Sequence, residues 1–314
     1  MEKLKVWFLS HKITALLIVG LVVLGMLGWL GVKQFTSQPS SATQEIDLLF
    51  DAEGPYAQLF PRRDGNALIL NLKRTASYDE ISYELAYTSL AEEVAVEGGK
   101  VKRIGDEGES GSVGESGVID RGVAGTIDTK DKKGEYEQEI LFGTCSKNVC
   151  KYDKGVENGT LTLKIKKGNK RSLRSNDLKL YRMITQWHLQ KPDVALGVLT
   201  SGDGHLNYIA DADRQTLANI GFTIINDLTG VPKLPSGKIV LGKVYSLNPP
   251  ITKDLPTGDV SLELAENPPS DAKLYRHNPS KSEWEELDTK IDGSKLSAKA
   301  SGAGIFAVFA KKEI

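Results

Sequence analysis

Residues 158–167 read Asn-Gly-Thr-Leu-Thr-Leu-Lys-Ile-Lys-Lys and decide the fold class. The three aliphatic residues alternate with threonine and lysine, which is the two-residue period of a β-strand with one buried and one solvated face. Residues 68–72 and 81–87 repeat this alternation. One-sided strands of this kind are typical of antiparallel sheets rather than of a buried parallel sheet. We therefore predict a mainly β protein built from antiparallel sheets.

The chain is predicted to hold two β-sandwich-like domains. Residues 231–237, with two prolines and a glycine, indicate a linker between them. Six short strands separated by turn signals follow in residues 238–314, which is the pattern of a small β-sandwich. Residues 45–230 form the first and larger β-rich domain. One helix is predicted there, capped by Asp213 and ended by Gly221.

Residues 13–32 are the strongest signal outside the β pattern, because 20 consecutive residues carry no charge. A helix of that length spans about 30 Å, which is the thickness of the hydrocarbon core of a bilayer. Lys3, Lys5 and Lys12 precede the run and favour a cytoplasmic N-terminus. The lipid bilayer is therefore an expected partner, through this single transmembrane helix.

The predicted topology places a cytoplasmic tail at residues 1–12, a transmembrane signal anchor at 13–32 and a stalk at 33–44. The bulk of the chain is then extracellular, on the outer side of the cell membrane. The alternative is a signal peptide that is cleaved near Ala42. The apolar run is longer than the roughly 7–15 residues of a signal-peptide core, which favours the retained anchor.

The composition excludes several classes of function. Lys plus Arg number 40 and Asp plus Glu number 41, so the formal net charge is -1. This balance gives no reason to expect a nucleic-acid partner. Two Cys and four His are too few for a cysteine-based structural zinc site or a histidine cluster. We therefore expect no metal and no cofactor.

The two cysteines, Cys145 and Cys150, are predicted to form a disulfide. An extracellular location permits such a bond. The spacing is C-x4-C, whereas a thioredoxin-like redox motif has the spacing C-x-x-C. A bridge here would pin a loop after the apolar strand that ends at Phe142.

A basic hairpin follows the strand that opened this section. Residues 164–182 contain eight lysines and arginines against the single acid Asp177. Such a surface could bind an anionic envelope polymer or lipid headgroups, although runs of charge are commonly just the solvated face of a strand. The candidate ligand-binding residues are Lys164, Lys166, Lys167, Lys170, Arg171 and Arg174.

No catalytic constellation is evident in the sequence. His188 and His205 have Asp203 and Asp211 nearby, but no G-x-S-x-G or H-E-x-x-H motif accompanies them. We predict no catalytic residues and expect that the protein is not an enzyme. A glycan-acting hydrolase remains an alternative, and it would require acidic side chains that converge in a cleft.

Two parts of the chain resemble known families. Residues 59–65, 81–87, 143–153, 158–163 and 187–190 together resemble uncharacterised membrane-anchored surface proteins of candidate-phylum bacteria, over about residues 45–210. This resemblance implies a bacterial cell-surface location and carries no activity.

The C-terminal domain resembles the ZU5-like and GAIN-like β-sandwich modules of prokaryotic surface proteins. The matching segments are residues 243–249, 260–264, 274–275, 284–287 and 304–309. Self-cleaving members of that group use a His-Phe-Ser motif. Residues 301–304 are Ser-Gly-Ala-Gly, so no autoproteolysis is expected.

These observations lead to one main hypothesis and two alternatives. The main hypothesis is a non-enzymatic, single-pass cell-envelope protein with a structural, adhesive or assembly role and an envelope protein as a possible partner. The alternatives are a module that binds an anionic envelope ligand through residues 164–182, and the glycan-acting hydrolase.

Overall fold

A computed structural model describes most of the chain after residue 44. The described residues are 45–47, 53–91, 93–95, 101–103, 117–131, 133–147, 149–167, 179–279 and 281–312. The predicted transmembrane segment, residues 13–32, lies outside these ranges. Within them, no helix has the length and apolarity needed to cross a membrane.

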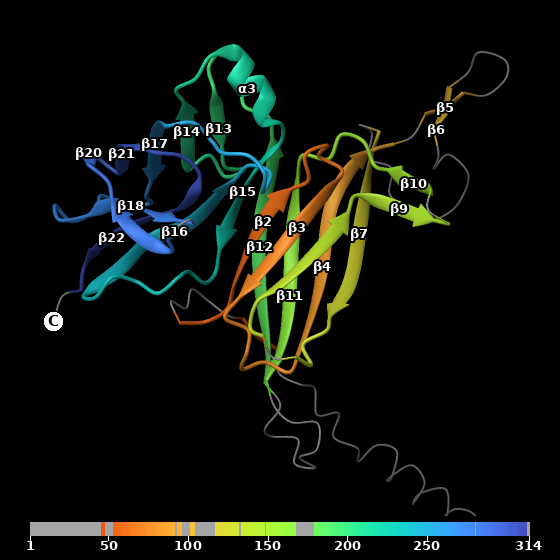
Figure 1. Ribbon diagram of the computed structural model, residues 1–314, viewed down its shortest axis with the longest axis horizontal. Helices are drawn as coiled ribbons and strands as arrows, with labels where there is room; N and C mark the ends of the chain where they lie inside the picture. Colours follow the sequence, from red (N-terminus) through yellow and green to blue (C-terminus); the bar gives the residue numbers. More distant parts are fainter. Residues whose placement is uncertain are drawn as a thin grey trace, which may run out of the picture. The chain divides into compact units, whose positions relative to one another are not determined.

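The described chain is mainly β and its sheets are almost entirely antiparallel, as the alternation predicts (Figure 1). The largest sheet runs in the order β19-β18-β22-β16-β15-β12-β11-β4-β7, and β1 joins it by a parallel pairing with β12. Its strands are β1 (Glu45–Asp47), β4 (Glu80–Leu90), β7 (Val118–Ile127), β11 (Asn158–Lys167), β12 (Lys179–Gln190), β15 (Thr223–Leu228), β16 (Lys238–Asn248), β18 (Lys273–Asn278), β19 (Glu283–Glu286) and β22 (Gly304–Lys311).

A three-stranded sheet packs against one part of the large sheet. It has the order β2-β3-β8, with bounds Tyr56–Pro61, Ala67–Lys73 and Tyr136–Leu141. The aliphatic side chains of β3 and β11 that define the two-residue period are all fully buried between the two layers. This first core therefore forms where the sequence pattern predicts a buried strand face.

A five-stranded sheet packs against another part. Its order is β13-β14-β17-β21-β20, with bounds Val198–Thr200, Leu206–Ala210, Gly258–Glu263, Lys295–Ala300 and Lys290–Asp292. The second core lies between this sheet and β15, β16, β18 and β22. The helix α3 (Arg214–Ile220) borders it, and Asp213 caps the helix by accepting from the Thr216 amide at 2.8 Å. The predicted helix is thus confirmed.

The two cores lie on opposite faces of the large sheet. In the β12–β15 pair, Leu189 is opposite Ile224, and His188 is opposite Ile225. Leu189 and Ile224 belong to the first core, whereas Ile225 belongs to the second. Because successive side chains of a strand point to opposite faces, the two cores cannot share a face. His188 therefore lies on the face of the second core.

The predicted linker, residues 231–237, joins two neighbouring strands of the large sheet. It connects β15 to β16, which pair antiparallel from Ile224–Asn248 to Leu228–Val244. Residues 44–314 form one compact unit. The second core also takes side chains from β13 and β14, which precede the linker. A proline- and glycine-rich stretch looks the same in sequence whether it joins domains or paired strands.

Two short hairpins complete the described structure. They pair β5 (Glu93–Ala95) with β6 (Val101–Arg103), and β9 (Gly143–Ser146) with β10 (Val149–Tyr152). After the linker, the alternation predicts six strands, at residues 238–247, 259–264, 273–276, 283–287, 295–300 and 305–310. They correspond to β16, β17, β18, β19, β21 and β22, and their bounds differ by no more than two residues at each end. The short strand β20 lacked an apolar alternation that would have predicted it.

Candidate functional site

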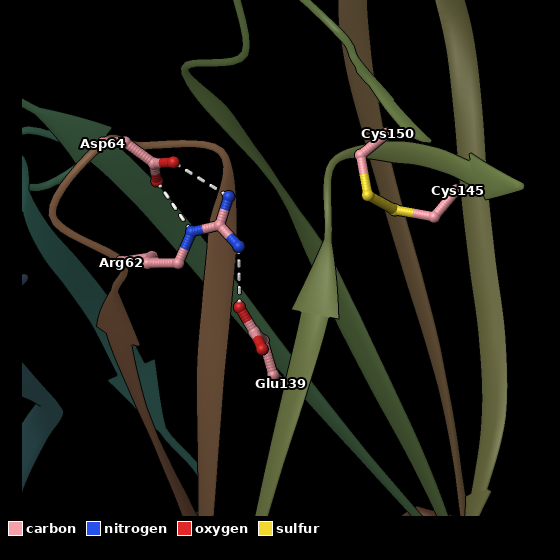
Figure 2. The surroundings of a disulfide bond; sticks show 5 residues. All are labelled: Arg62, Asp64, Glu139, Cys145 and Cys150. Carbon is pink, nitrogen blue, oxygen red and sulfur yellow. Dashed lines mark hydrogen bonds and ion pairs between the residues drawn. A yellow bond between two sulfur atoms is a disulfide. The ribbon is translucent and has the colours of Figure 1, made fainter. Parts of the chain in front are cut away.

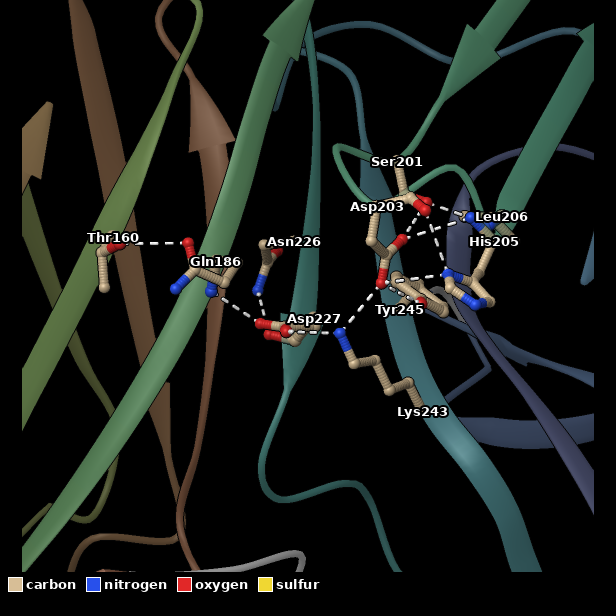
Figure 3. A network of polar contacts seen from close by, with 10 residues as sticks. All are labelled: Thr160, Gln186, Ser201, Asp203, His205, Leu206, Asn226, Asp227, Lys243 and Tyr245. Carbon is tan, nitrogen blue, oxygen red and sulfur yellow. Dashed lines mark hydrogen bonds and ion pairs between the residues drawn. The ribbon is translucent and has the colours of Figure 1, made fainter. Parts of the chain in front are cut away.

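A pocket of about 380 Å³ opens beside the second core. It lies between the loop that connects β13 to β14 and the exposed part of the large sheet (Figure 3). From the large sheet, the second core takes residues of β15, β16, β18 and β22 but none of β11 or β12. The five-stranded sheet therefore leaves the face of β11 and β12 uncovered. The pocket is lined by Asn158, Gly159, Gln186, Trp187, His188, Ser201, Gly202, Asp203, Ile225, Asp227, Lys243 and Tyr245.

Asp203 is the most heavily bonded side chain in the pocket. Its Oδ1 accepts from Ser201 Oγ at 2.7 Å and from the His205 amide at 3.2 Å. Its Oδ2 accepts from Lys243 Nζ at 2.9 Å and from Tyr245 Oη at 2.7 Å. The first pair holds the loop in its own shape, and the second pair ties the loop to β16. Asp203 therefore holds the β13–β14 loop, on one side of the pocket, against β16 on the other side.

Lys243 lies between two carboxylates (Figure 3). Its Nζ is 2.9 Å from Asp203 Oδ2 and 3.8 Å from Asp227 Oδ2. The other carboxylate oxygen of Asp227 accepts from the backbone amide of Gln186 at 2.6 Å. This bond replaces a ladder bond at the point where β15 and β12 separate, since their pairing ends at Trp187 and Asn226. The separation of the two strands is what opens the floor of the pocket.

The two carboxyl groups have opposite pKa shifts. Burial alone would raise the pKa of Asp203, but the donors Lys243, Ser201 and Tyr245 together hold it well below its usual range. Burial raises the pKa of Asp227, and its bond from the Gln186 amide only partly offsets this. The bond to Asp203 in turn raises the pKa of Lys243. At neutral pH the pocket therefore contains a firmly ionised Asp203, a charged Lys243 and a poorly compensated Asp227.

Several hydrogen-bonding groups that line the pocket lack a full set of partners among the described residues. His188 Nδ1 is buried and has no hydrogen-bond partner among the described residues. Gln186 is exposed and its Oε1 accepts from Thr160 Oγ1 at 3.0 Å, which leaves its amide NH₂ as a donor. Asn158 is also exposed at the rim. The pocket thus presents both donors and acceptors to whatever enters it.

The opposite shifts predict opposite responses of the two aspartates to mutation. Asp203→Asn should lower the free energy of unfolding at pH 7 by about 2 kcal/mol, because it weakens several hydrogen bonds to a charged group. A carboxyl whose folded pKa is depressed stabilises the fold above its unfolded pKa of about 3.9, and this stability is lost as the pH falls further. The deficit of Asp203→Asn should therefore shrink below about pH 4.

Asp227→Asn should not destabilise the protein at pH 7. A raised folded pKa contributes stability below the unfolded pKa, and that stability is lost as the pH rises through the folded pKa. At neutral pH the parent therefore gains nothing from ionised Asp227. Urea denaturation of both variants between pH 7 and pH 3 checks the contrast. Equal losses at every pH would contradict it.

The predicted disulfide is present. Cys145 and Cys150 lie directly opposite each other in the β9–β10 hairpin and their sulfur atoms are bonded (Figure 2). The hairpin follows Phe142, as expected.

Near the disulfide, Arg62 bonds Asp64 through two nitrogens at 2.8 Å and Glu139 through a third at 2.9 Å. These bonds tie the β2–β3 turn to β8, and the Arg62 partner together with Asn66 lowers the pKa of Asp64 to about 2.

The described lysines of the predicted basic hairpin lie next to acids and an aromatic ring. Lys166 Nζ is 2.9 Å from Glu80, and Lys164 Nζ is 3.9 Å from Glu84, both on the neighbouring strand β4. Lys167 lies over the ring of Tyr78 at 5.8 Å. Lys170, Arg171 and Arg174 lie outside the described residues.

The pocket brings together residues that the sequence analysis connected only in part. The sequence places His205 close to Asp203, and the shortest distance between their side chains is 3.5 Å. His188 lines the same pocket, but Asp211 does not. Lys243, Tyr245 and Asp227 were missed, because they reach the pocket through strand pairing across long separations in sequence. In the sequence, Lys243 and Tyr245 lie two residues apart within a predicted strand. This spacing places them on one face of the strand but does not by itself indicate a pocket. The described residues contain no group of acids, histidines and cysteines arranged to hold a metal ion.

Comparison with known proteins adds no name to this site. No protein-family model matches the chain, and no curated protein matches it either.

Proposed function

We propose that the protein is a non-enzymatic, single-pass cell-envelope protein. Residues 13–32 would anchor it in the bilayer with the N-terminus in the cytoplasm. Residues 45–314 would then stand outside the membrane as two sandwich-like halves that share one sheet. Their role would be structural, adhesive or in assembly.

The observation that carries this proposal is the Cys145–Cys150 disulfide. It uses both cysteines of the chain, and both are exposed. Disulfides persist in extracellular and periplasmic compartments and are rare in the reducing cytosol. The disulfide therefore supports the same orientation that Lys3, Lys5 and Lys12 favour through the positive-inside rule.

The contacts in the pocket favour binding over hydrolysis. A two-carboxylate glycosidase places one carboxylic acid and one carboxylate on either side of the bond that is cleaved. Asp203 and Asp227 do line one pocket, which is the specific observation in favour of the hydrolase. However, the Lys243 ammonium stands between them, and four donors keep Asp203 ionised. Asp203 is therefore engaged by its own donors and is not free to act as the second member of such a pair.

Binding of an anionic ligand through residues 164–182 has less support. The ion pairs of Lys164 and Lys166 with β4 neutralise part of the charge on which this alternative depends. The remaining charge would have to come from Lys167, Lys170, Arg171 and Arg174.

Protease accessibility tests the proposed orientation. The full chain carries one epitope tag at each end, and bacterial spheroplasts that express it are treated with proteinase K. We expect loss of the C-terminal tag and protection of the N-terminal tag, because only the C-terminal side faces outward. Maleimide should modify Cys145 and Cys150 only after reduction. A variant with Lys3, Lys5 and Lys12 changed to Gln should lose the uniform orientation.

Two results of this experiment would contradict the proposal. A C-terminal tag that survives in intact spheroplasts but not in lysed ones would contradict the proposed orientation. Cysteines that react without reduction would remove the observation that carries it.

A further inference from the structure

We propose that the pocket beneath the β13–β14 loop is a binding site for a neutral, polyhydroxylated ligand, such as one sugar ring. The ring could be a free sugar or an exposed residue of a polysaccharide. This inference goes beyond the proposed envelope role, because it assigns a ligand class and a location to the binding.

Unused hydrogen-bonding capacity is the first reason. Among the described residues, the partner recorded for Asp227 Oδ2 is the Lys243 ammonium at 3.8 Å. An ammonium has three donors, so Lys243 can still donate beyond its bond to Asp203. His188 Nδ1 is buried in the pocket wall without a described partner. Asp227 Oδ2 and the Lys243 ammonium can therefore each form a further hydrogen bond with a ligand in the pocket.

The balance of charge decides between ligand classes. An anion that approached Lys243 would also meet the carboxylates of Asp203 and Asp227. A cation that approached Asp227 would meet the Lys243 ammonium. A hydroxyl group carries no net charge, and it both donates and accepts a hydrogen bond. It can therefore accept from Lys243 or the Gln186 amide and donate to Asp227 without electrostatic conflict.

The size and shape of the pocket agree with a small ring. Its volume of about 380 Å³ is near the lower end of the roughly 300–1,000 Å³ that is usual for small-molecule sites. Gly202 in the loop carries no side chain over His188. A Cβ at this position would lie 3.4 Å from His188 Nδ1. Glycine at position 202 therefore keeps the part of the pocket next to the His188 ring free of a side chain.

Saturation-transfer NMR on the full chain in lipid nanodiscs tests the proposal. Glycoside detergents are avoided, because their headgroups are themselves sugars. The neutral probes are glucose, galactose, mannose and N-acetylglucosamine, and the charged probes are acetate and ethanolamine. We expect saturation transfer to at least one neutral probe and none to the charged probes. The protein's retention on dextran and agarose beads then separates polysaccharide recognition from binding of free sugars alone.

Two variants and one control localise the binding. Asp227→Asn should weaken it about ten-fold or more, because a hydrogen bond to a charged acceptor is lost. Gly202→Leu should abolish binding, because the added side chain would fill the pocket next to His188. The control is Asp259→Asn, since Asp259 is an exposed residue of β17 that pairs with Lys299 at 3.7 Å outside the pocket. It should leave the affinity unchanged.

Three outcomes would overturn the assignment. They are an absence of transfer to every neutral probe, transfer that both pocket variants leave unchanged, and stronger transfer to acetate or ethanolamine. Each of these readouts is independent of the protease experiment. A failed ligand and a failed topology are therefore distinguishable.

Discussion

Phe142→Ala is expected to lower the free energy of unfolding by about 3–5 kcal/mol, which is the usual cost of deleting a buried aromatic ring. Phe142 is fully buried in the first core. Its ring stacks on Trp187 with centroids 5.6 Å apart and meets the ring of Tyr87 at 5.0 Å. The deletion removes both contacts and leaves a cavity between the two layers. Urea denaturation of the purified chain measures the loss.

A neighbouring residue provides the control for this prediction. Val149 lies on β10, seven residues from Phe142, and is 74% exposed. Val149→Ala should change stability by no more than about 0.5 kcal/mol. Similar losses in the two variants would mean that the disulfide hairpin, and not the ring packing, sets the stability of this region.

Arg276→Met is expected to lower the free energy of unfolding by about 3 kcal/mol, because it removes the buried donor of several hydrogen bonds and leaves their acceptors unpaired. Arg276 on β18 is 6% exposed. Its Nε donates to the carbonyls of Gly302 and Ala303, and its Nη1 donates to Ser301 Oγ and to Glu285 at 3.0 Å. Methionine fills similar space but provides none of these donors. The loop at residues 301–303 would lose its anchor.

Two comparisons sharpen the test of Arg276. Arg276→Lys keeps the charge but not the planar fork, so its loss should be smaller than that of Arg276→Met. Lys299→Met removes an exposed cation, and it should cost at most about 1 kcal/mol because surface ion pairs contribute little. A loss for Arg276→Met no larger than that for Lys299→Met would show that the loop is held by other contacts.

Local features of the sequence were sufficient for much of the fold. The alternation in residues 158–167 predicted a one-sided strand, and its three aliphatic side chains are indeed fully buried. The cap at Asp213 predicted a helix start that a hydrogen bond to Thr216 confirms. The spacing of Cys145 and Cys150 allowed a bridge across a tight hairpin. Each of these features depends on residues only a few positions apart.

Other predictions fall on parts of the chain that the structure does not describe. The transmembrane anchor at residues 13–32 and the basic residues Lys170, Arg171 and Arg174 remain predictions. The protease experiment tests the anchor directly.

The sequence by itself therefore determined the strand pattern, the helix and the disulfide, because periodicity, capping and short spacing are local properties of the chain. Only the tertiary structure decided that residues 231–237 connect paired strands, and that the two cores occupy opposite faces of a shared sheet. It alone also brought Asp203 and Asp227 to either side of Lys243. These three residues lie on a loop and two strands far apart in sequence. The pairing of β12 with β15 and of β15 with β16 sets where their side chains meet, and the choice of partner strand depends on contacts between distant segments.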